Sequence, residues 1–181
     1  MSTALQRVRF TRSEYMCMAS ILADQRTELI DGDIIEMPPI RTPHMLVVTR
    51  LLWRLAQFNE EGRLLVQQPI VDYNEPQPDL LVLREPLGQQ KPNARDCLAI
   101  IEVADSTYAA DVAIKLPAYL RGGAAAVWVV NISDRANPEI EVWTPGSGEP
   151  VHARNVVTLA DITISLDDVF QGLTEIPPEG R

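Results

Sequence analysis

Two acidic residues stand at the ends of short apolar runs, and a lysine follows them along the chain. Asp79 begins the run Asp-Leu-Leu-Val-Leu, and Glu102 lies near the end of Cys-Leu-Ala-Ile-Ile-Glu-Val. Both runs are rich in branched aliphatic residues and bounded by breaker residues, which predicts two buried strands. A buried carboxylate needs a cation, a hydrogen-bond network or a metal as its partner. The pair therefore indicates a shared divalent ion, with Lys115 brought back over the same strand ends by a helix that begins near Asp111.

The same residues also have ordinary structural interpretations. Asp79 and Glu102 could each cap a strand end or pair with a surface arginine. Lys115 could be a solvated helix lysine paired with Asp111 at i, i+4, a contact worth only a few tenths of a kcal/mol. The sequence by itself leaves these alternatives open.

The scarcity of nitrogen and sulfur ligands limits the choice of metal. The chain has two histidines, His44 and His152, and its two cysteines, Cys17 and Cys97, have no close Cys or His neighbour. This spacing does not indicate a zinc site, and we expect both cysteines to be buried, reduced thiols. A metal bound mainly by oxygen ligands would be magnesium or manganese.

Length, composition and charge narrow the class of protein. A chain of 181 residues, 46% hydrophobic and 23% charged, is typical of one globular domain; we expect residues 1–170 to form it and residues 171–181 to be a proline-rich, frayed tail. It has no apolar run of about 18 residues and no secretory signal pattern, which predicts a cytoplasmic protein that does not enter the membrane. The net charge of −9 argues against a protein that coats nucleic acid generally, because an acidic surface repels phosphates. It leaves room for an enzyme that grips nucleic acid through one basic patch.

The elements that must position these residues follow from periodicity and turn signals. Thr11 to Glu14 is a capping-box pattern that opens a helix, Asp31-Gly32 is a hairpin turn, and Pro117 inside a helical segment predicts a late start or a bend. The expected order gives a mixed central β-sheet flanked by α-helices, an α/β fold. The expected helices are 11–23, 42–59 and 108–121 with a short amphipathic turn at 166–170, and the expected strands are 27–30, 34–37, 64–70, 79–83, 97–103, 125–131, 140–143 and 151–157.

Five segments in this order resemble the Uma-two family, a bacterial group with a restriction-endonuclease-like fold in the PD-(D/E)XK nuclease superfamily. The segments are Thr27-Glu-Leu-Ile-Asp-Gly-Asp-Ile-Ile-Glu-Met, His44, Glu75-Pro-Gln-Pro-Asp-Leu, Ile101-Glu-Val-Ala-Asp-Ser-Thr, and Asp111 to Lys115-Leu-Pro-Ala-Tyr. The resemblance covers about residues 10 to 170. Each motif is weak alone, and their order makes the resemblance specific.

The resemblance implies a role for each matching position. Asp79 and Glu102, with the carbonyl of Val103, would hold one Mg²⁺ or Mn²⁺, and Lys115 would position a water or neutralise charge. The commonest superfamily pattern has its lysine where this chain has Ala104, and the family takes it from the next helix instead. Glu28 matches a family position and could add a third carboxylate, act as a catalytic base that holds a water, or be an ordinary hairpin residue. His44 could act in the site or be a hydrogen-bonded structural histidine.

The implied activity is phosphodiester hydrolysis, with DNA as substrate and a homodimer as the acting form. Restriction, repair and mobile-element roles fit the same site. The chain departs from the family at Ala126, where the family has a glutamate, and at Asn131, where it has an aspartate. The acidic charge, Ala104 and Ala126 favour a different class, a non-catalytic binding or regulatory module with a nuclease-like fold. The presence of Asp79, Glu102 and Lys115 together argues against it, because a binding module needs no such set. A hydrolase of a small phosphoester would share the metal site but lack a basic groove. The basic residues that could line such a groove are Arg41, Arg50, Arg54, Arg84 and Lys91.

Overall fold

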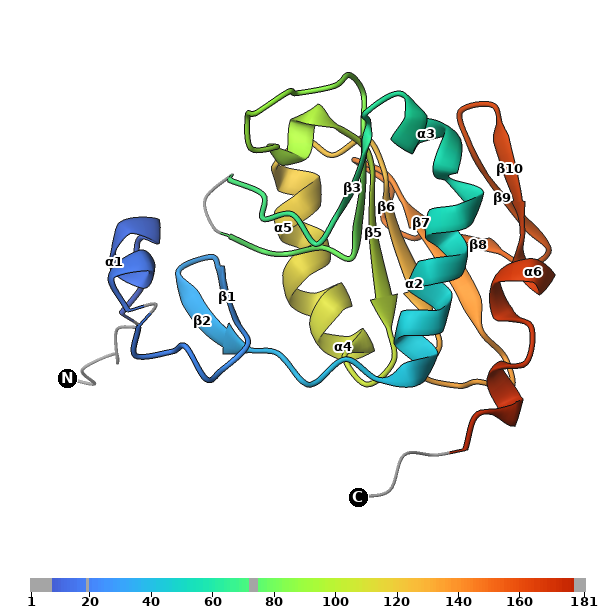
Figure 1. Ribbon diagram of the computed structural model, residues 1–181, viewed down its shortest axis with the longest axis horizontal. Helices are drawn as coiled ribbons and strands as arrows, with labels where there is room; N and C mark the ends of the chain where they lie inside the picture. The colour runs from blue at the N-terminus through green and yellow to red at the C-terminus, as the bar shows by residue number, and fades with distance from the viewer. Residues whose placement is uncertain (1–7, 19, 72–74, 178–181) are drawn as a thin grey trace.

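A six-stranded mixed sheet forms the centre of the protein in the computed structural model, which describes residues 8–18, 20–71 and 75–177 (Figure 1). The strand order is β3-β4-β5-β6-β7-β8; β5 and β6 run parallel, and the other neighbours pair antiparallel. The strands are β3 (Leu64–Val66), β4 (Leu80–Leu83), β5 (Cys97–Ala104), β6 (Val127–Asn131), β7 (Glu139–Trp143) and β8 (Val151–Ala153). The two apolar runs at Asp79 and Glu102 are therefore adjacent buried strands, as predicted.

Helices cover both faces of this sheet (Figure 1). On one face α2 (Thr42–Arg54) packs against alternate strand residues such as Val82 and Ile101. On the other face lies a continuous helical segment made of α4 (Tyr108–Ala110), a π-helical turn (Asp111–Lys115) and α5 (Leu116–Arg121), which packs against the intervening residues. The predicted α/β class, a mixed central sheet flanked by helices, is confirmed.

The hairpin β1 (Thr27–Ile30) and β2 (Asp33–Glu36) has the predicted two-residue turn. Asp31 and Gly32 both have positive φ, 50° and 80°, which suits the twist of a tight hairpin. An ion pair between Asp31 and Arg121 at 2.5 Å ties the turn to α5. This contact holds the hairpin against the helical segment 108–121. Glu28 of β1 is 1% exposed there and lies next to Lys115 of that segment.

Several element boundaries differ from those predicted. Helix α1 (Arg12–Cys17) has the expected capping box between Thr11 and Glu14, but it ends early and buries no side chain. The helix expected over residues 42–59 is broken at Leu55 into α2 and α3 (Ala56–Glu60), and its N-cap is Arg41 without a side-chain cap bond. The strand expected over 64–70 ends at Val66, because Gln67 has φ 48°.

The C-terminal third contains a second hairpin that the sequence patterns did not predict. The segment expected as one strand, 151–157, divides into β8 and β9 (Val156–Leu159), and β9 pairs with β10 (Ile162–Ser165). Helix α6 (Leu166–Phe170) occupies the expected amphipathic turn. Leu173 beyond it is 1% exposed and belongs to the core, so the predicted frayed tail is wrong for this part of the chain; residues 178–181 lie outside the described residues.

Three tryptophans and two cysteines differ in their burial. Trp128 is buried and Trp143 half-buried, whereas Trp53 is 77% exposed on α2. Cys97 is a buried free thiol, but Cys17 is exposed, because the end of α1 faces solvent.

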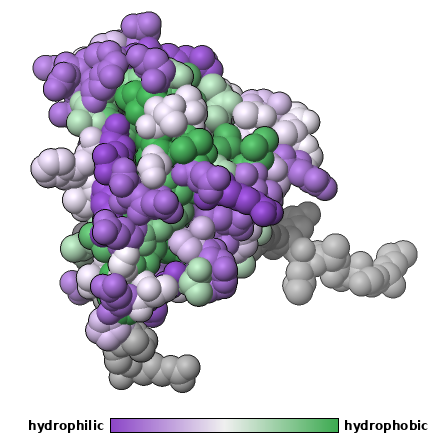
Figure 2. All heavy atoms as spheres, turned by 90° about the vertical axis from the view of Figure 1, so that its right-hand side faces the viewer, coloured by the Kyte–Doolittle hydropathy of each residue, from purple (hydrophilic) through white to green (hydrophobic). Residues whose placement is uncertain are grey.

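The face that carries α6 and the β9–β10 hairpin shows hydrophobic residues scattered among hydrophilic ones (Figure 2). No helix in the described ranges is long and apolar enough to cross a membrane.

Candidate metal centre

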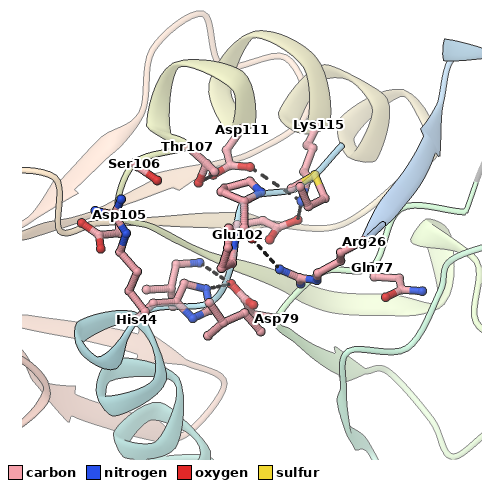
Figure 3. Close-up of a pocket in the computed structure, with 16 residues that line it drawn as sticks. Arg26, His44, Gln77, Asp79, Glu102, Asp105, Ser106, Thr107, Asp111 and Lys115 are labelled. Carbon is pink, nitrogen blue, oxygen red and sulfur yellow. Dashed lines mark hydrogen bonds and ion pairs between the residues drawn. The ribbon is translucent and has the colours of Figure 1, made fainter. Parts of the chain in front are cut away.

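Asp79 and Glu102 lie side by side where β4 meets β5. Leu80 pairs with Ile101 in this antiparallel ladder. Asp79 precedes Leu80 and Glu102 follows Ile101, so the two acids are cross-strand neighbours. Both residues are 4% exposed and line one pocket (Figure 3). The structure thus brings together the two carboxylates that the sequence singled out.

Asp79 is held by one of its two oxygens. Oδ2 contacts His44 Nε2 at 3.0 Å and accepts the backbone N–H of Val103 at 2.8 Å. His44 comes from the first turn of α2, and Val103 from β5. Among the described residues nothing hydrogen-bonds to Oδ1, which leaves that oxygen for a ligand.

Glu102 is held in the same way. Its Oε1 accepts the hydroxyl of Tyr119 at 2.6 Å and lies 3.3 Å from Lys115 Nζ. Both contacts fall on Oε1, and no described side chain or backbone group bonds to Oε2. Each carboxylate therefore has one anchored oxygen and one oxygen without a protein partner.

Lys115 is the cation at the centre of an acidic cluster. Its Nζ lies 3.2 Å from Glu28 Oε2, 3.3 Å from Glu102 Oε1 and 3.7 Å from Asp111 Oδ1. Asp111 also accepts the hydroxyl of Thr107 at 2.5 Å. Since the lysine side chain is only 6% exposed, it is a buried counter-ion, and the solvated-lysine alternative is wrong.

A π-helical turn places these side chains on one face of the helical segment. In a regular α-helix each step of four residues rotates by about 40°, so Asp111, Lys115 and Tyr119 would diverge by roughly 80°. The i→i+5 bonding of the π-turn over Asp111–Lys115 holds more residues per turn and offsets that drift. Pro117 explains the turn, because in a tight α-helix its ring would clash with the carbonyl of Ala113. The helical segment begins at Tyr108, so the late start given as one alternative is wrong; the chain accommodates Pro117 through the π-turn that precedes it.

Burial and mutual repulsion shift the protonation of this cluster. Burial raises the pKa of Glu102 well above its ordinary 4.5, against the opposing effect of Lys115. Burial likewise raises the pKa values of Glu28 and Asp111. Burial alone would lower the pKa of Lys115, but Glu102, Glu28 and the other acids outweigh it and raise that pKa. Lys115 is thus a firmly protonated ammonium among carboxylates that resist joint ionisation.

The pocket in front of these groups is narrow, with a volume of about 40 Å³. A water needs about 10–15 Å³, so the space suits an ion with a few waters. Residues 37–41 and the strand end at 105–107 form its rim, and Arg26 and Arg41 are the arginines that line it.

Most of the basic residues expected to line a groove lie elsewhere. Arg50 donates to the carbonyls of Val169 and Gln171. The other three are held in ion pairs or backbone contacts: Arg54 with Asp168, Arg84 with the Arg95 carbonyl, and Lys91 with Glu75. Of the five candidates, only Arg41 borders the pocket.

The donor set fits an oxygen-binding divalent cation. Asp79 Oδ1 and Glu102 Oε2 are the unanchored oxygens, and Val103 also lines the pocket. The N–H and C=O of one strand residue point to the same side. Because the Val103 N–H points to Asp79, its carbonyl faces that side too. Three oxygens and no nitrogen or sulfur suit Mg²⁺ or Mn²⁺.

A second group, Glu139, Glu141 and His152, has ligand atoms within 4.8 Å of one another. Glu141 accepts hydrogen bonds from Tyr108 at 2.6 Å and Trp143 at 3.0 Å, and Glu139 pairs with His152 at 2.9 Å. Both oxygens of Glu141 are thus already engaged within the protein, unlike the free oxygens of Asp79 and Glu102.

Sequence reasoning missed Tyr119 and Arg26 and gave Asp111 no role of its own. The spacing of four residues from Asp111 to Lys115 and again to Tyr119 was a usable signal for two of them. Arg26 carried no local signal, since a fold in three dimensions is needed to bring it to the pocket.

Comparison with known proteins agrees with this architecture. The sequence profile of the Uma2 family, described as "Putative restriction endonuclease", matches residues 12–179. The chain belongs to the Uma2 family. A search of curated proteins finds no match. Among solved structures, the chain is similar to one described as a "putative nuclease belonging to DUF820" from Anabaena variabilis, with a TM-score of 0.68 and 15% identity over 91% of this chain and 99% of that one. The restriction-endonuclease-like fold expected from the resemblance is confirmed.

Proposed function

We propose that this protein is a metal-dependent nuclease that hydrolyses phosphodiester bonds in DNA. The observation that carries the proposal is the pair of neighbouring carboxylates, each anchored through one oxygen and each presenting the other to a shared pocket beside a buried lysine. Membership of a family described as "Putative restriction endonuclease" supports the same activity.

In this proposal Asp79, Glu102 and the carbonyl of Val103 hold Mg²⁺ or Mn²⁺. The chemistry that a divalent cation would supply there is stabilisation of the negative charge that builds on a phosphate during hydrolysis. Lys115 is the catalytic residue: its ammonium, fixed by three carboxylates, neutralises charge on the reacting phosphate or orients the attacking water. The contacts give His44 and Glu28 positioning roles, since they hold Asp79 and Lys115 respectively.

The pocket is open to solvent, so a nucleic-acid backbone can present one phosphate at its rim. Arg26 and Arg41 on that rim supply the positive charge that a phosphate requires.

A homodimer is part of the proposal on the resemblance alone: nucleases of this superfamily that cut both strands often act as symmetric dimers. Sedimentation velocity of the purified protein, alone and with a short duplex, tests it. A single species at the monomer mass under both conditions contradicts the dimer.

The test of the function begins with manganese titration by calorimetry of the wild-type protein and Asp79→Asn, followed by incubation of both with linear and circular DNA and Mg²⁺ or Mn²⁺. We expect wild-type binding and cleavage, both lost in Asp79→Asn. Binding of metal and DNA without cleavage would instead establish the regulatory-module function, which the net charge of −9 and the alanine at position 126 favour. Absence of metal binding in the wild type overturns the nuclease.

A further inference from the structure

Tyr119 joins the helical segment to Glu102 through one short hydrogen bond. Its ring is 2% exposed and packs in the core between α5 and the sheet, with Ile100 and Val129. Its hydroxyl donates to Glu102 Oε1 at 2.6 Å. Since the ring is locked by packing, the position of the hydroxyl is fixed by the fold and not by the carboxylate that it meets.

This hydrogen bond restricts the rotation of the Glu102 carboxylate about its last side-chain torsion. The last torsion of a glutamate side chain has only broad preferences, so a carboxylate at a pocket wall could present either oxygen at many angles. Tyr119 and Lys115 both engage Oε1, which defines the rotation of the group and leaves Oε2 for the pocket. Burial and Glu102 raise the pKa of Tyr119, so the hydroxyl keeps the proton that it donates.

The opposite side of the pocket uses the same arrangement. Asp79 has His44 and the Val103 N–H on Oδ2, with Oδ1 left over. Partners that orient a ligand in this way change metal affinity by about 10–100-fold when they are removed. An accidental contact would have no reason to be repeated on both carboxylates.

We propose that Tyr119 is a positioning residue of the metal centre, whose hydroxyl fixes Glu102 so that Oε2 faces the divalent cation. The proposal rests on the proposed function, because it needs a cation between Asp79 and Glu102. It assigns a purpose to a residue that touches neither the pocket nor a substrate.

The chain offers a matched control for the test. Tyr108 also donates its hydroxyl to a buried glutamate at 2.6 Å, but its acceptor is Glu141, away from the pocket. Tyr119→Phe and Tyr108→Phe thus remove the same atom and the same kind of bond. A purely structural role for both tyrosines predicts no effect of either substitution on metal binding.

The experiment is calorimetric titration of manganese into wild type, Tyr119→Phe and Tyr108→Phe, with urea unfolding of each. We expect the dissociation constant to rise about 10–100-fold in Tyr119→Phe and to stay within about twofold in Tyr108→Phe. Equal affinity in wild type and Tyr119→Phe overturns the inference alone, as does a loss confined to Tyr108→Phe, which would place the metal at Glu139, Glu141 and His152. No binding in the wild type overturns the proposed function and the inference with it.

If Tyr119→Phe fails to fold, wild-type protein labelled with 3-fluorotyrosine gives the answer by fluorine NMR. The resonances are assigned by replacing the other tyrosines one at a time. We expect Mg²⁺ to shift the Tyr119 resonance and leave that of Tyr108 in place. An unmoved Tyr119 resonance at saturating Mg²⁺ overturns the inference.

Discussion

At the scale of single residues, the centre of the site is one ammonium shared by three carboxylates. Lys115 contacts Glu28, Glu102 and Asp111, and the four side chains are all buried. Removing one partner of a buried ionic cluster leaves the other charges without a counter-ion. This lowers the stability of the fold more than replacing the whole cluster with apolar residues would. The lysine is therefore a structural requirement of the metal-free protein, apart from the catalytic role proposed for it.

Replacing Lys115 with methionine should lower the free energy of unfolding by roughly 3–5 kcal/mol, measured by urea unfolding in the presence of a chelator. Lys91→Met is the control, because Lys91 is 51% exposed and only 3.5 Å from Glu75; exposed pairs of this kind are worth about 0–1 kcal/mol. Manganese should restore part of the lost stability of Lys115→Met, since a cation can replace the ammonium. Equal, small effects of the two substitutions would contradict the counter-ion role.

The raised pKa of Glu102 makes a prediction about pH. The folded, metal-free protein keeps a proton on this buried group at pH values where the unfolded chain, with an ordinary pKa of 4.5, has released it. The stability that this group contributes is therefore full below about pH 4.5 and is lost as the pH rises through the raised value. The Glu102→Gln variant lacks this pH-dependent contribution to stability, because glutamine has no titrating proton.

The difference in unfolding free energy, Glu102→Gln minus wild type, should consequently grow as the pH rises above about 4.5. Urea unfolding at several pH values with chelator present measures it. A difference that stays constant with pH would show that Glu102 ionises normally in the folded protein.

The sequence was informative for residues whose local surroundings show their burial. Asp79 and Glu102 stand in apolar runs, and an acid in such a place needs a partner. Tyr119 gave no such sign, because a tyrosine on a buried helix face is ordinary packing until its hydroxyl is known to meet a carboxylate. Arg26 likewise depends on a long-range contact that no local pattern encodes.

At the scale of elements, the π-turn is the device that aligns Asp111, Lys115 and Tyr119. Replacing Pro117 with alanine removes the ring that opposes regular α-helix and restores a backbone donor. We expect a higher free energy of unfolding, by about 1 kcal/mol or more, together with weaker manganese binding because Lys115 and Tyr119 rotate relative to Glu102.

Pro145→Ala, in the exposed turn between β7 and β8, serves as the control and should leave manganese affinity unchanged. The result that supports the role of the π-turn is a higher free energy of unfolding together with weaker manganese binding in Pro117→Ala. Unchanged affinity in Pro117→Ala would show that the alignment does not depend on the proline.

Turn chemistry explains which elements were predictable. The sequence Asp31-Gly32 predicts its hairpin, because Asp-Gly is a pair that favours the positive φ angles that both residues adopt in the turn. The β9–β10 turn uses Ala160 at φ 53°, a residue type that rarely signals such a conformation, and the hairpin went unpredicted. The break at Leu55 has no glycine or proline to mark it; packing of Leu55 and Phe58 into the core decides it, and tertiary packing cannot be read from local propensity.

At the scale of the whole molecule, charge limits how a nucleic acid can approach. The chain carries a net charge of −9, and four buried acids surround the site: Glu28, Asp79, Glu102 and Asp111. Arg26 and Arg41 line the pocket, while the other basic residues that could have formed a groove are held elsewhere. A phosphate backbone therefore meets a small positive rim on a protein that otherwise repels it.

This distribution predicts weak salt dependence of DNA binding. Each phosphate neutralised contributes about −0.9 to the slope of log affinity against log salt concentration, so contacts by Arg26 and Arg41 alone give a slope of about −2. Fluorescence anisotropy of a labelled duplex, with calcium in place of magnesium, measures it. Arg26→Gln and Arg41→Gln should each lower affinity and reduce the slope by about 1, whereas Arg84→Gln, whose wild-type side chain donates to the Arg95 carbonyl, should change neither. A slope several times steeper, or an equal effect of Arg84→Gln, would mean that the backbone runs over a wider basic surface, one assembled by a second copy of the chain.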